Sequence, residues 1–554
     1  MMRRICVVNM GDLAREFETM GFEVLNLALE PGVHDVSAIL DERGFVPDLL
    51  VEVESLGPRT ILAGLENLHC VRLFWSIDTH LNSWWQRHYG RLFDAVLTTQ
   101  GHWVRRLEEM GVPAAHWLPW FGTERPFVPW DEREHDMGFI GRLTGFRPLR
   151  KRLVDFLSER YGLAHFDNVP FARLLETYER FRIVPNESIL SEVNFRLFEG
   201  ASAGCLVVNQ QVGCDVGQLF VPGREILVYS DILELDELVR RTLARRDEAQ
   251  AMARAAWERV RREHLLSHRA ASILSIASEA AGRAASGAEA RTAFVRTLAI
   301  LREAEFIICN DAKLLAMLDA LSADPELLAR ALRLRTIIDR RDEVRSACVG
   351  ILDAAAHRES FDVNFAGSMC MLACGEWDMA KSFWYRQVDA CGAKWCKPES
   401  PRDLHLAWSR ECVRRGALYR PGLRYDVVEG LPEAALESLI AADSAAPGDM
   451  EVKSRMETVL SRLEGVDELR LGVLSELSLH APDNWRIGLE LGLVNLRAMR
   501  LEAGLEELRL ALDIAVGQGK ETMFMRALAA RDISGRTARF LKLGRLMSGA
   551  SASL

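Results

Sequence analysis

Asn194-Phe-Arg-Leu-Phe-Glu-Gly-Ala-Ser-Ala-Gly-Cys-Leu-Val-Val-Asn-Gln210 is the stretch of this sequence that decides the fold. Its first half is typical of a helix, and the apolar run after the second glycine is typical of a buried strand. In a helix that begins at Asn194, the side chains of Arg196, Glu199 and Gly200 share one face, on which a polar ligand could lie. Asn194 could cap this helix, where unpaired amides favour an anion. An ordinary helix–strand unit with a surface ion pair is the alternative.

The length and composition indicate a globular chain of several domains. The sequence has 554 residues, of which 49% are hydrophobic and 27% charged, with a formal net charge of −10. One domain per ~150 residues suggests three or more domains. The negative charge gives no support to nucleic-acid binding.

Several features predict a cytoplasmic protein. Residues 1–10 are typical of a first strand and not of a signal peptide, and no apolar run is long enough to cross a membrane. The eleven cysteines are scattered, and their spacing is not that of a metal site. We therefore expect reduced thiols, most of them buried.

Short β-branched runs alternate with helical runs over the first half of the chain, which predicts parallel sheets covered by helices. Prolines and a glycine interrupt the pattern at 121–134 and separate two series. We expect two Rossmann-like domains, at 1–125 and 126–277, the second ending in a long charged helical stretch at 236–277. The expected strands lie at 5–9, 23–27, 48–53, 72–77, 94–98 and 116–119, and then at 137–141, at 181–184, in the apolar second part of the 194–210 stretch and at 225–229.

The second half of the chain is predicted to be helical. Residues 278–291, rich in Ala, Gly and Ser, are typical of a linker, and strand signals nearly vanish in 292–554. Paired helices with small residues at their contacts suggest an α-solenoid, because such hairpins bury their apolar faces only by stacking. The run 375–385 has the order of a tetratricopeptide hairpin, and 491–514 is a weaker case. An irregular helical bundle is the alternative.

Several ordered motifs resemble one family of enzymes. The run Gly138-Phe-Ile-Gly-Arg142 is followed by Arg147, and Asn194, Arg196 and Glu199 fit an N-x-R-x-x-E pattern that continues to a glycine. The region resembles the donor half of a GT-B glycosyltransferase, family-1-like and of the CgeB type. The resemblance implies two Rossmann-like domains, an acceptor side at 1–125 and a nucleotide-sugar side at 126–277.

The resemblance also implies roles for individual residues. Glu199 would bind the ribose hydroxyls of the nucleotide, and Asn194 and Arg196 would belong to the same donor site. Gly141, Arg142 and Arg147, in the loop after a strand, would face the diphosphate, so that neither a metal nor a cofactor is needed. A solvated surface loop is the alternative explanation of these arginines. The residues expected to bind the donor are Gly141, Arg142, Arg147, Asn194, Arg196 and Glu199.

One departure from the family pattern leaves the stereochemistry open. Glu192 lies one residue too close to Glu199 to match the paired glutamates of the retaining enzymes, and Ser191 takes the expected position. Either Glu192 reaches the site through a local shift, or the first glutamate is absent and Asn194 or Arg196 takes part. We favour the second explanation, because the N-x-R-x-x-E pattern fits the closer family.

The predicted first sheet carries the candidate catalytic residues. Asp78 and His80 follow the strand at 72–77, and either could take the proton of an acceptor hydroxyl. The aromatic residues that follow, Trp84 and Trp85 among them, could stack on a sugar or a peptide. Alternatively, Asp78 caps the next helix and the tryptophans belong to the core.

These observations predict a cytoplasmic glycosyltransferase that uses a nucleotide-sugar as donor substrate. The acceptor is expected to be a protein, such as a surface or flagellar protein, or a glycan, with 292–554 binding the acceptor or another protein partner. One alternative is a transferase for lipid-linked or polysaccharide acceptors in envelope biosynthesis. Another is a non-catalytic scaffold of the same architecture.

Overall fold

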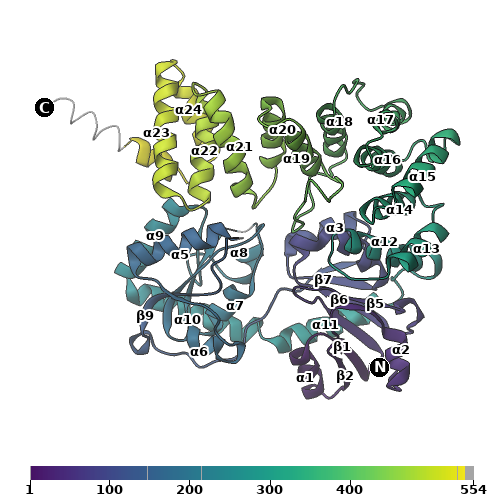
Figure 1. The fold of residues 1–554 in the computed structure, drawn as a ribbon. Helices are drawn as coiled ribbons and strands as arrows, with labels where there is room; N and C mark the ends of the chain where they lie inside the picture. The colour runs from purple at the N-terminus through teal and green to yellow at the C-terminus, as the bar shows by residue number, and fades with distance from the viewer. Residues whose placement is uncertain (1, 146, 212, 214, 533, 543–554) are drawn as a thin grey trace. The chain divides into compact units, whose positions relative to one another are not determined.

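The computed structural model describes residues 2–145, 147–211, 213, 215–532 and 534–542, and its contacts divide the chain into two compact units (Figure 1). Unit 1 consists of Met1–Pro119 and Leu266–Val452, and unit 2 consists of Trp120–Leu265 and Lys453–Leu554. Each unit therefore joins one parallel sheet to helices from the second half of the chain.

Unit 1 is built on a six-stranded parallel sheet with the order β2-β1-β4-β6-β7-β8. Its strands are β1 (Arg4–Val8), β2 (Glu23–Leu27), β4 (Leu49–Val53), β6 (Val71–Ser76), β7 (Ala95–Thr98) and β8 (Ala115–Trp117). A small parallel sheet pairs β3 (Gly32–Asp35) with β5 (Thr60–Ala63). The helices between the strands are α1 (Gly11–Thr19), α2 (Val36–Glu42), α3 (Thr79–Tyr89) and α4 (Val104–Glu109). The predicted strands of the first series are confirmed, and the small sheet was missed.

Unit 2 is built on a five-stranded parallel sheet with the order β10-β9-β11-β12-β13. Its strands are β9 (His135–Ile140), β10 (Ala164–Phe166), β11 (Phe181–Asn186), β12 (Leu206–Gln210) and β13 (Leu227–Tyr229). Its helices in this half of the chain are α5 (Pro148–Tyr161), α6 (Leu174–Tyr178), α7 (Phe195–Ser202), α8 (Asp215–Leu219), α9 (Ile232–Ala244) and α10 (Arg246–Glu263). The fold class predicted from the sequence, α/β followed by all-α, is confirmed.

The stretch Asn194–Gln210 forms α7 and β12, as the sequence predicts. Gly204 turns the chain between them with φ +70°, and a Cβ at this position would lie 2.8 Å from the guanidinium of Arg133. Only glycine fits both the backbone conformation and the available space. The turn therefore sets how the end of α7 connects to the start of β12.

The long charged stretch predicted to be helical at 236–277 is helical, but it is divided into separate helices. The chain forms α9, α10 and α11 (Leu266–Ala280), with breaks at Arg245 and His264. The ring of His264 is buried against Phe198 and Phe220, which holds the second break. After this break α11 belongs to unit 1.

The helices after residue 286 are divided between the units, whereas the sequence placed them in one helical region. Unit 1 contains α12 (Gly287–Glu303), α13 (Asp311–Ala320), α14 (Pro325–Ile337), α15 (Arg341–Asp353), α16 (Phe361–Ala373), α17 (Trp377–Cys391), α18 (Pro401–Arg414) and α19 (Ala435–Ala445). Unit 2 contains α21 (Asp467–His480), α22 (Trp485–Arg497), α23 (Leu501–Gly517) and α24 (Glu521–Ala529), and α20 (Met450–Leu460) crosses the boundary. The exact domain limits and the tetratricopeptide likeness stay predictions.

Small residues lie at the helix contacts, as the sequence suggested. A Cβ on Gly367 of α16 would lie 2.7 Å from the ring of Phe383 on α17. In the second hairpin, a Cβ on Gly492 of α22 would lie 2.5 Å from Leu508 of α23. These glycines let the helix axes approach closely, so larger residues there would force the hairpins apart.

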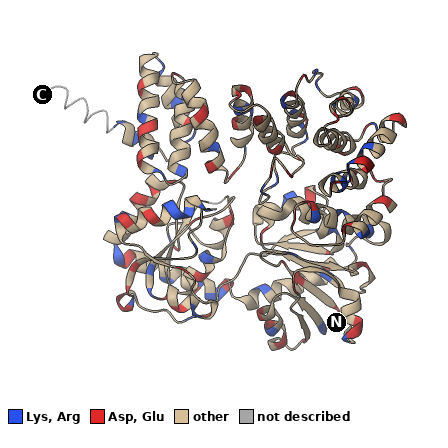
Figure 2. Cartoon of the chain, in the orientation of Figure 1, with Lys and Arg blue, Asp and Glu red and all other residues tan. Residues whose placement is uncertain are grey.

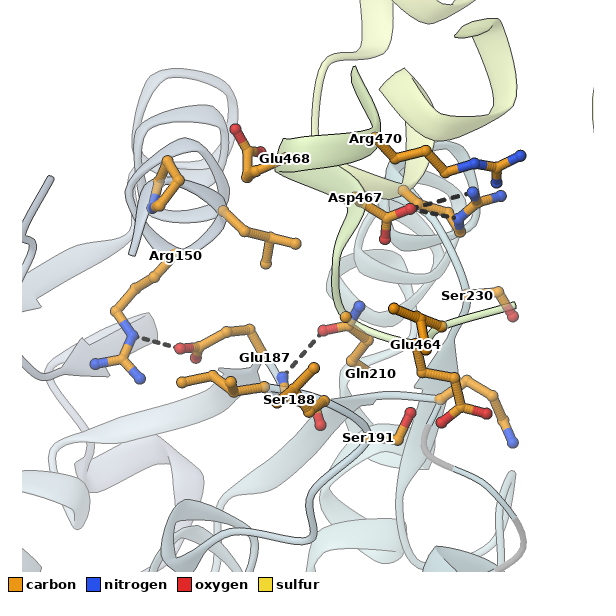
Figure 3. Close-up of a pocket in the computed structure, with 18 of the residues that line it drawn as sticks. Arg150, Glu187, Ser188, Ser191, Gln210, Ser230, Glu464, Asp467, Glu468 and Arg470 are labelled. Carbon is orange, nitrogen blue, oxygen red and sulfur yellow. Dashed lines mark hydrogen bonds and ion pairs between the residues drawn. The ribbon is translucent and has the colours of Figure 1, made fainter. Parts of the chain in front are cut away.

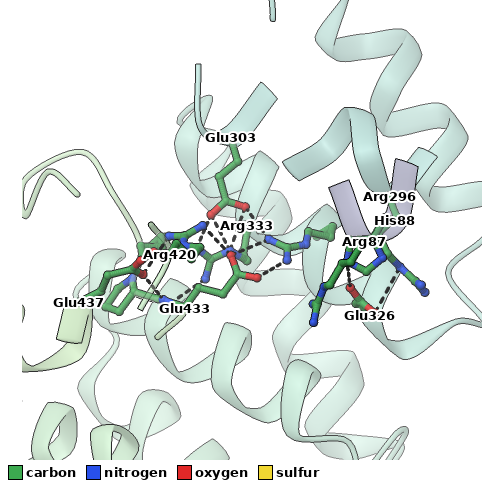
Figure 4. Close-up of polar contacts among 12 residues, drawn as sticks. Arg87, His88, Arg296, Glu303, Glu326, Arg333, Arg420, Glu433 and Glu437 are labelled. Atoms are coloured by element: carbon green, nitrogen blue, oxygen red, sulfur yellow. Dashed lines mark hydrogen bonds and ion pairs between the residues drawn. The ribbon is translucent and has the colours of Figure 1, made fainter. Parts of the chain in front are cut away.

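Buried ion pairs hold the helices of unit 1 together (Figure 4). Arg333 of α14 contacts Glu303 of α12 and donates to the carbonyl oxygens of Leu431 (2.7 Å) and Pro432 (2.9 Å). Arg330 donates to Glu433 at 2.9 Å. Elsewhere basic and acidic residues are interspersed over both units (Figure 2).

Among the described helices, none is long and apolar enough to cross a bilayer.

Candidate functional site

A pocket of about 970 Å³ lies in unit 2, where the strands of the sheet end (Figure 3). One wall comes from the first turn of α5 and from residues at or just after the ends of β11, β12 and β13, including Ser188, Gln210 and Ser230. The other wall comes from the turn between α20 and α21 and from the helices beyond it. Ligands of open parallel sheets bind at the carboxyl ends of the strands. The pocket is therefore the candidate binding site of this unit.

A buried carboxylate organises the floor of the pocket. Glu187, which follows β11 and is 2% exposed, contacts the guanidinium of Arg150 and accepts from that of Arg196 at 3.0 Å. Arg196 also donates to Asn186 at 2.8 Å and lies over the ring of Phe139 at 4.3 Å. The two arginines come from different helices, so this one carboxylate ties α5 and α7 to the edge of the sheet.

Asn194 occupies the N-cap position of α7, but the predicted side-chain cap is wrong. Within the described residues its amide makes no bond to the first amides of the helix. It donates instead to the carbonyl oxygen of Glu187 at 2.8 Å and accepts from Asn186 at 2.9 Å. The predicted surface ion pair also differs, since Arg196 pairs with Glu187 and not with Glu199. Asn194 and Arg196 therefore already have protein partners at this edge of the sheet.

Glu199 lies half-buried on α7 and accepts from the hydroxyl of Tyr178 at 3.2 Å. Burial raises the pKa of the Glu199 carboxyl above its usual value, and nearby Arg196 opposes this effect. The carboxylate can accept further hydrogen bonds, as ribose binding requires. That role stays a prediction.

The loop after β9 carries the three other expected donor residues. Gly141 has φ +147°, and its amide donates to Phe166 at 3.0 Å. Arg142 is exposed, and Arg147 is an exposed residue at the N-cap position of α5. Of the six residues expected to bind the donor, Arg147 is the one that lines the described pocket.

In unit 1, Asp78 and His80 follow β6, as the sequence predicts. Asp78 occupies the N-cap position of α3, but among the described residues its side chain does not bond to the helix amides, so the capping alternative is wrong. His80 is buried at 2% exposure. These two residues belong to unit 1, whereas the donor candidates belong to unit 2.

Glu54 fixes the loop that carries Asp78. Its carboxylate accepts from the backbone amides of Ile77 (2.7 Å) and Asp78 (2.9 Å) and from the side chain of Asn82 (2.7 Å). Arg59 lies 3.7 Å from the same carboxylate. Glu54 therefore sets the backbone position from which the Asp78 side chain projects.

The suggestion that the aromatic residues of α3 stack on a ligand is not supported by their positions. Trp85 is buried at 1% exposure. Trp84 packs against Phe306 and donates to the carbonyl oxygen of Pro421 at 2.9 Å. The core alternative is therefore correct for both tryptophans.

Sequence reasoning missed three residues that organise these sites: Glu54, Arg150 and Glu187. Each glutamate stands at or just beyond the end of a central strand, and such a position is the signal that could have indicated it.

A family model described as "Glycosyl transferase-like" matches residues 133–275, which contain the sheet side of the pocket. No curated protein sequence matches the chain.

Solved structures with similar chains have low sequence identity. Sucrose-phosphate synthase from Thermosynechococcus elongatus has 11% identity and a TM-score of 0.38, covering 50% of this chain and 98% of that one. A glycosyltransferase from Rickettsia africae ESF-5 has 12% identity and a TM-score of 0.38, covering 51% and 100%. Anabaena Alr3699/HepE in complex with UDP has 12% identity and a TM-score of 0.37, covering 50% and 100%. With the two parallel sheets and the family match, the fold class is GT-B with additional helices.

Proposed function

We propose that this chain is a glycosyltransferase that moves a sugar from a nucleotide-sugar donor to an acceptor. The observation that carries the proposal is the pocket at the carboxyl ends of the strands in unit 2, inside the segment that the family model matches. Its volume, about 970 Å³, lies within the range of small-molecule sites, about 300–1,000 Å³.

The donor diphosphate is proposed to lie against the first turn of α5. Helix N-termini attract anions through unpaired amides and the helix dipole, and Arg147 adds an exposed guanidinium at the same place. These groups would stabilise the nucleoside diphosphate as it leaves, without a metal or a cofactor. Glu199 is proposed to bind the ribose, with Gly141, Arg142, Asn194 and Arg196 shaping the neighbouring loops.

Asp78 or His80 is proposed as the base toward the acceptor. Its role would be to take the proton of the acceptor hydroxyl while that oxygen bonds to the anomeric carbon of the sugar. The bond from that carbon to the phosphate oxygen breaks, and its electron pair leaves with the nucleoside diphosphate. The position of both residues at the carboxyl end of β6 supports this role.

We infer that the acceptor is a protein, held with the help of the helices after residue 286. The support is the series of helix hairpins, since stacked hairpins present extended surfaces suited to polypeptides. The test must separate this proposal from two alternatives. One is a transferase with a lipid-linked or polysaccharide acceptor, and the other is a non-catalytic scaffold.

A thermal-shift screen followed by a transfer assay tests the proposal. The probes are the matched pairs UDP and UDP-glucose, GDP and GDP-mannose, and dTDP and dTDP-glucose. A ligand at 100 times its dissociation constant should stabilise the protein by about 2.7 kcal/mol. Radiolabelled donor of the pair that binds is then incubated with protein, lipid and polysaccharide fractions of a cell extract. Label in the protein fraction supports a protein acceptor, whereas no shift with any probe supports the scaffold.

A further inference from the structure

The C-terminal helices of unit 2 are built onto its sheet domain. Leu153 and Leu157 of α5 share one hydrophobic core with Leu493 and Leu496 of α22. At the edge of this core, Arg152 of α5 contacts Glu468 and donates to the carbonyl oxygen of Ala498 at 2.6 Å. The second wall of the pocket is therefore held by packing and hydrogen bonds to the first wall.

The turn between α20 and α21 lies directly on the loop after β11. A Cβ on Gly465, whose φ is +70°, would lie 2.7 Å from the Cα atom of Leu190. Leu190 and the next residue, Ser191, themselves have positive φ values of 51° and 62°. The α20–α21 turn and the loop after β11 therefore contact each other through their backbones. Glu464 lies at the end of the pocket where Figure 3 also shows Ser191.

Most charged side chains that line the pocket are already paired. On the helical wall Asp467 pairs with Arg497 at 3.1 Å. Glu490 on the same wall contacts Arg470 at 2.9 Å and also contacts Arg531. Because their charges are already neutralised by protein partners, these side chains have little electrostatic attraction left for a ligand.

Two lining charges differ from the others. Among the described residues, Arg147 on the sheet wall and Glu464 on the helical wall make no ion pair or side-chain hydrogen bond, and both are exposed. The pocket therefore offers one available cation and one available carboxylate on opposite walls. An ideal ligand has an anionic part for Arg147 and hydroxyl donors for Glu464.

We propose that Glu464 binds hydroxyl groups of the donor sugar, so that the C-terminal helices help to select the sugar. This inference rests on the proposed function and deepens it. A carboxylate accepts hydrogen bonds from sugar hydroxyls but repels a diphosphate, whereas Arg147 and the first turn of α5 attract one. The two walls together orient the donor, with its phosphates at α5 and its sugar at the α20–α21 turn.

Isothermal titration calorimetry on Glu464→Ala, using the nucleotide pair that the wild-type protein binds, tests the inference. The affinity for the nucleotide-sugar should fall about 10-fold or more, because a hydrogen bond to a charged group is lost. The affinity for the nucleoside diphosphate alone should change less than about 2-fold. Glu506→Gln, an exposed change on α23 away from the pocket, is the matched control and should leave both affinities unchanged.

A second measurement uses donors whose sugar lacks one hydroxyl. The deoxy donor that removes the contacted hydroxyl should bind the wild-type protein and Glu464→Ala equally. Equal affinities of the two proteins for the intact nucleotide-sugar would overturn the inference, as would an equal loss for nucleotide and nucleotide-sugar. Failure of the proposed function is distinguishable, because the wild-type protein would then bind none of the nucleotides.

Discussion

The substitution Glu187→Gln removes the carboxylate that ties α5 and α7 to the sheet of unit 2. Glu187 is 2% exposed, and the side chains of its partners Arg150 and Arg196 are 9% and 10% exposed. Without the carboxylate, the two buried guanidiniums lose the counter-charge that both of them contact. Removing one partner of a buried ion pair lowers the free energy of unfolding by about 3–5 kcal/mol.

The hydrogen bonds give a similar range, about 3–6 kcal/mol for two bonds. Each bond to a charged group contributes about 1.5–3 kcal/mol, and Glu187 accepts from both arginines. For a unit of this size, about 3–5 kcal/mol corresponds to a fall in melting temperature of roughly 6–20 °C. Differential scanning calorimetry should show this fall in the transition of unit 2, while that of unit 1 stays in place.

Glu468→Gln is the matched control, because it breaks a partly exposed pair with Arg152 in the same unit. Such a pair contributes about 1 kcal/mol or less. The reasoning is refuted if Glu187→Gln destabilises unit 2 no more than Glu468→Gln does.

Three further predictions concern the donor, the acceptor and pH. Glu199→Ala should abolish nucleotide binding, measured by calorimetry, and leave the circular dichroism spectrum unchanged. Normal transfer by this variant would contradict the assignment of Glu199 to the ribose. Asp78→Asn should keep the nucleotide-induced thermal shift and lower the rate of transfer, and loss of the shift would indicate a structural role. Burial raises the pKa of Glu52 to about 8, despite its hydrogen bond from Tyr89. The folded state therefore keeps a proton that the unfolded chain releases above about pH 4.3, so this residue lowers stability as pH rises toward 8. Glu52→Gln should raise the melting temperature of unit 1 more at pH 8 than at pH 5, and an equal effect at both values would contradict the shift.

The sequence predicts the two sheets well because their strands are short, β-branched and separated by turn residues. The opening stretch forms α7 and β12 because its helical face and its apolar run are each distinct. β10 was missed because it has only three residues, Ala164–Phe166, without a buried apolar run. The break at His264 was missed because it has no proline or glycine and depends on packing against rings distant in the sequence.

The site was predictable only in part. From its place in the loop after β9, Arg147 was expected to bind the donor, and it does line the pocket. Glu187 was not indicated, because its partners lie 37 and 9 residues away and the pairing depends on the fold. The helical wall could not be foreseen either, since α5 meets the C-terminal helices across 346 residues of chain.

The central claim is that the pocket of unit 2 binds a nucleotide-sugar. The most direct measurement is a crystal structure of the whole chain grown with the nucleotide-sugar that gives the largest thermal shift. We expect phosphates within hydrogen-bonding distance of Arg147 and the first turn of α5, with the sugar next to Glu464. A donor bound elsewhere on the chain, or one bound with its phosphates against the helical wall, would contradict it.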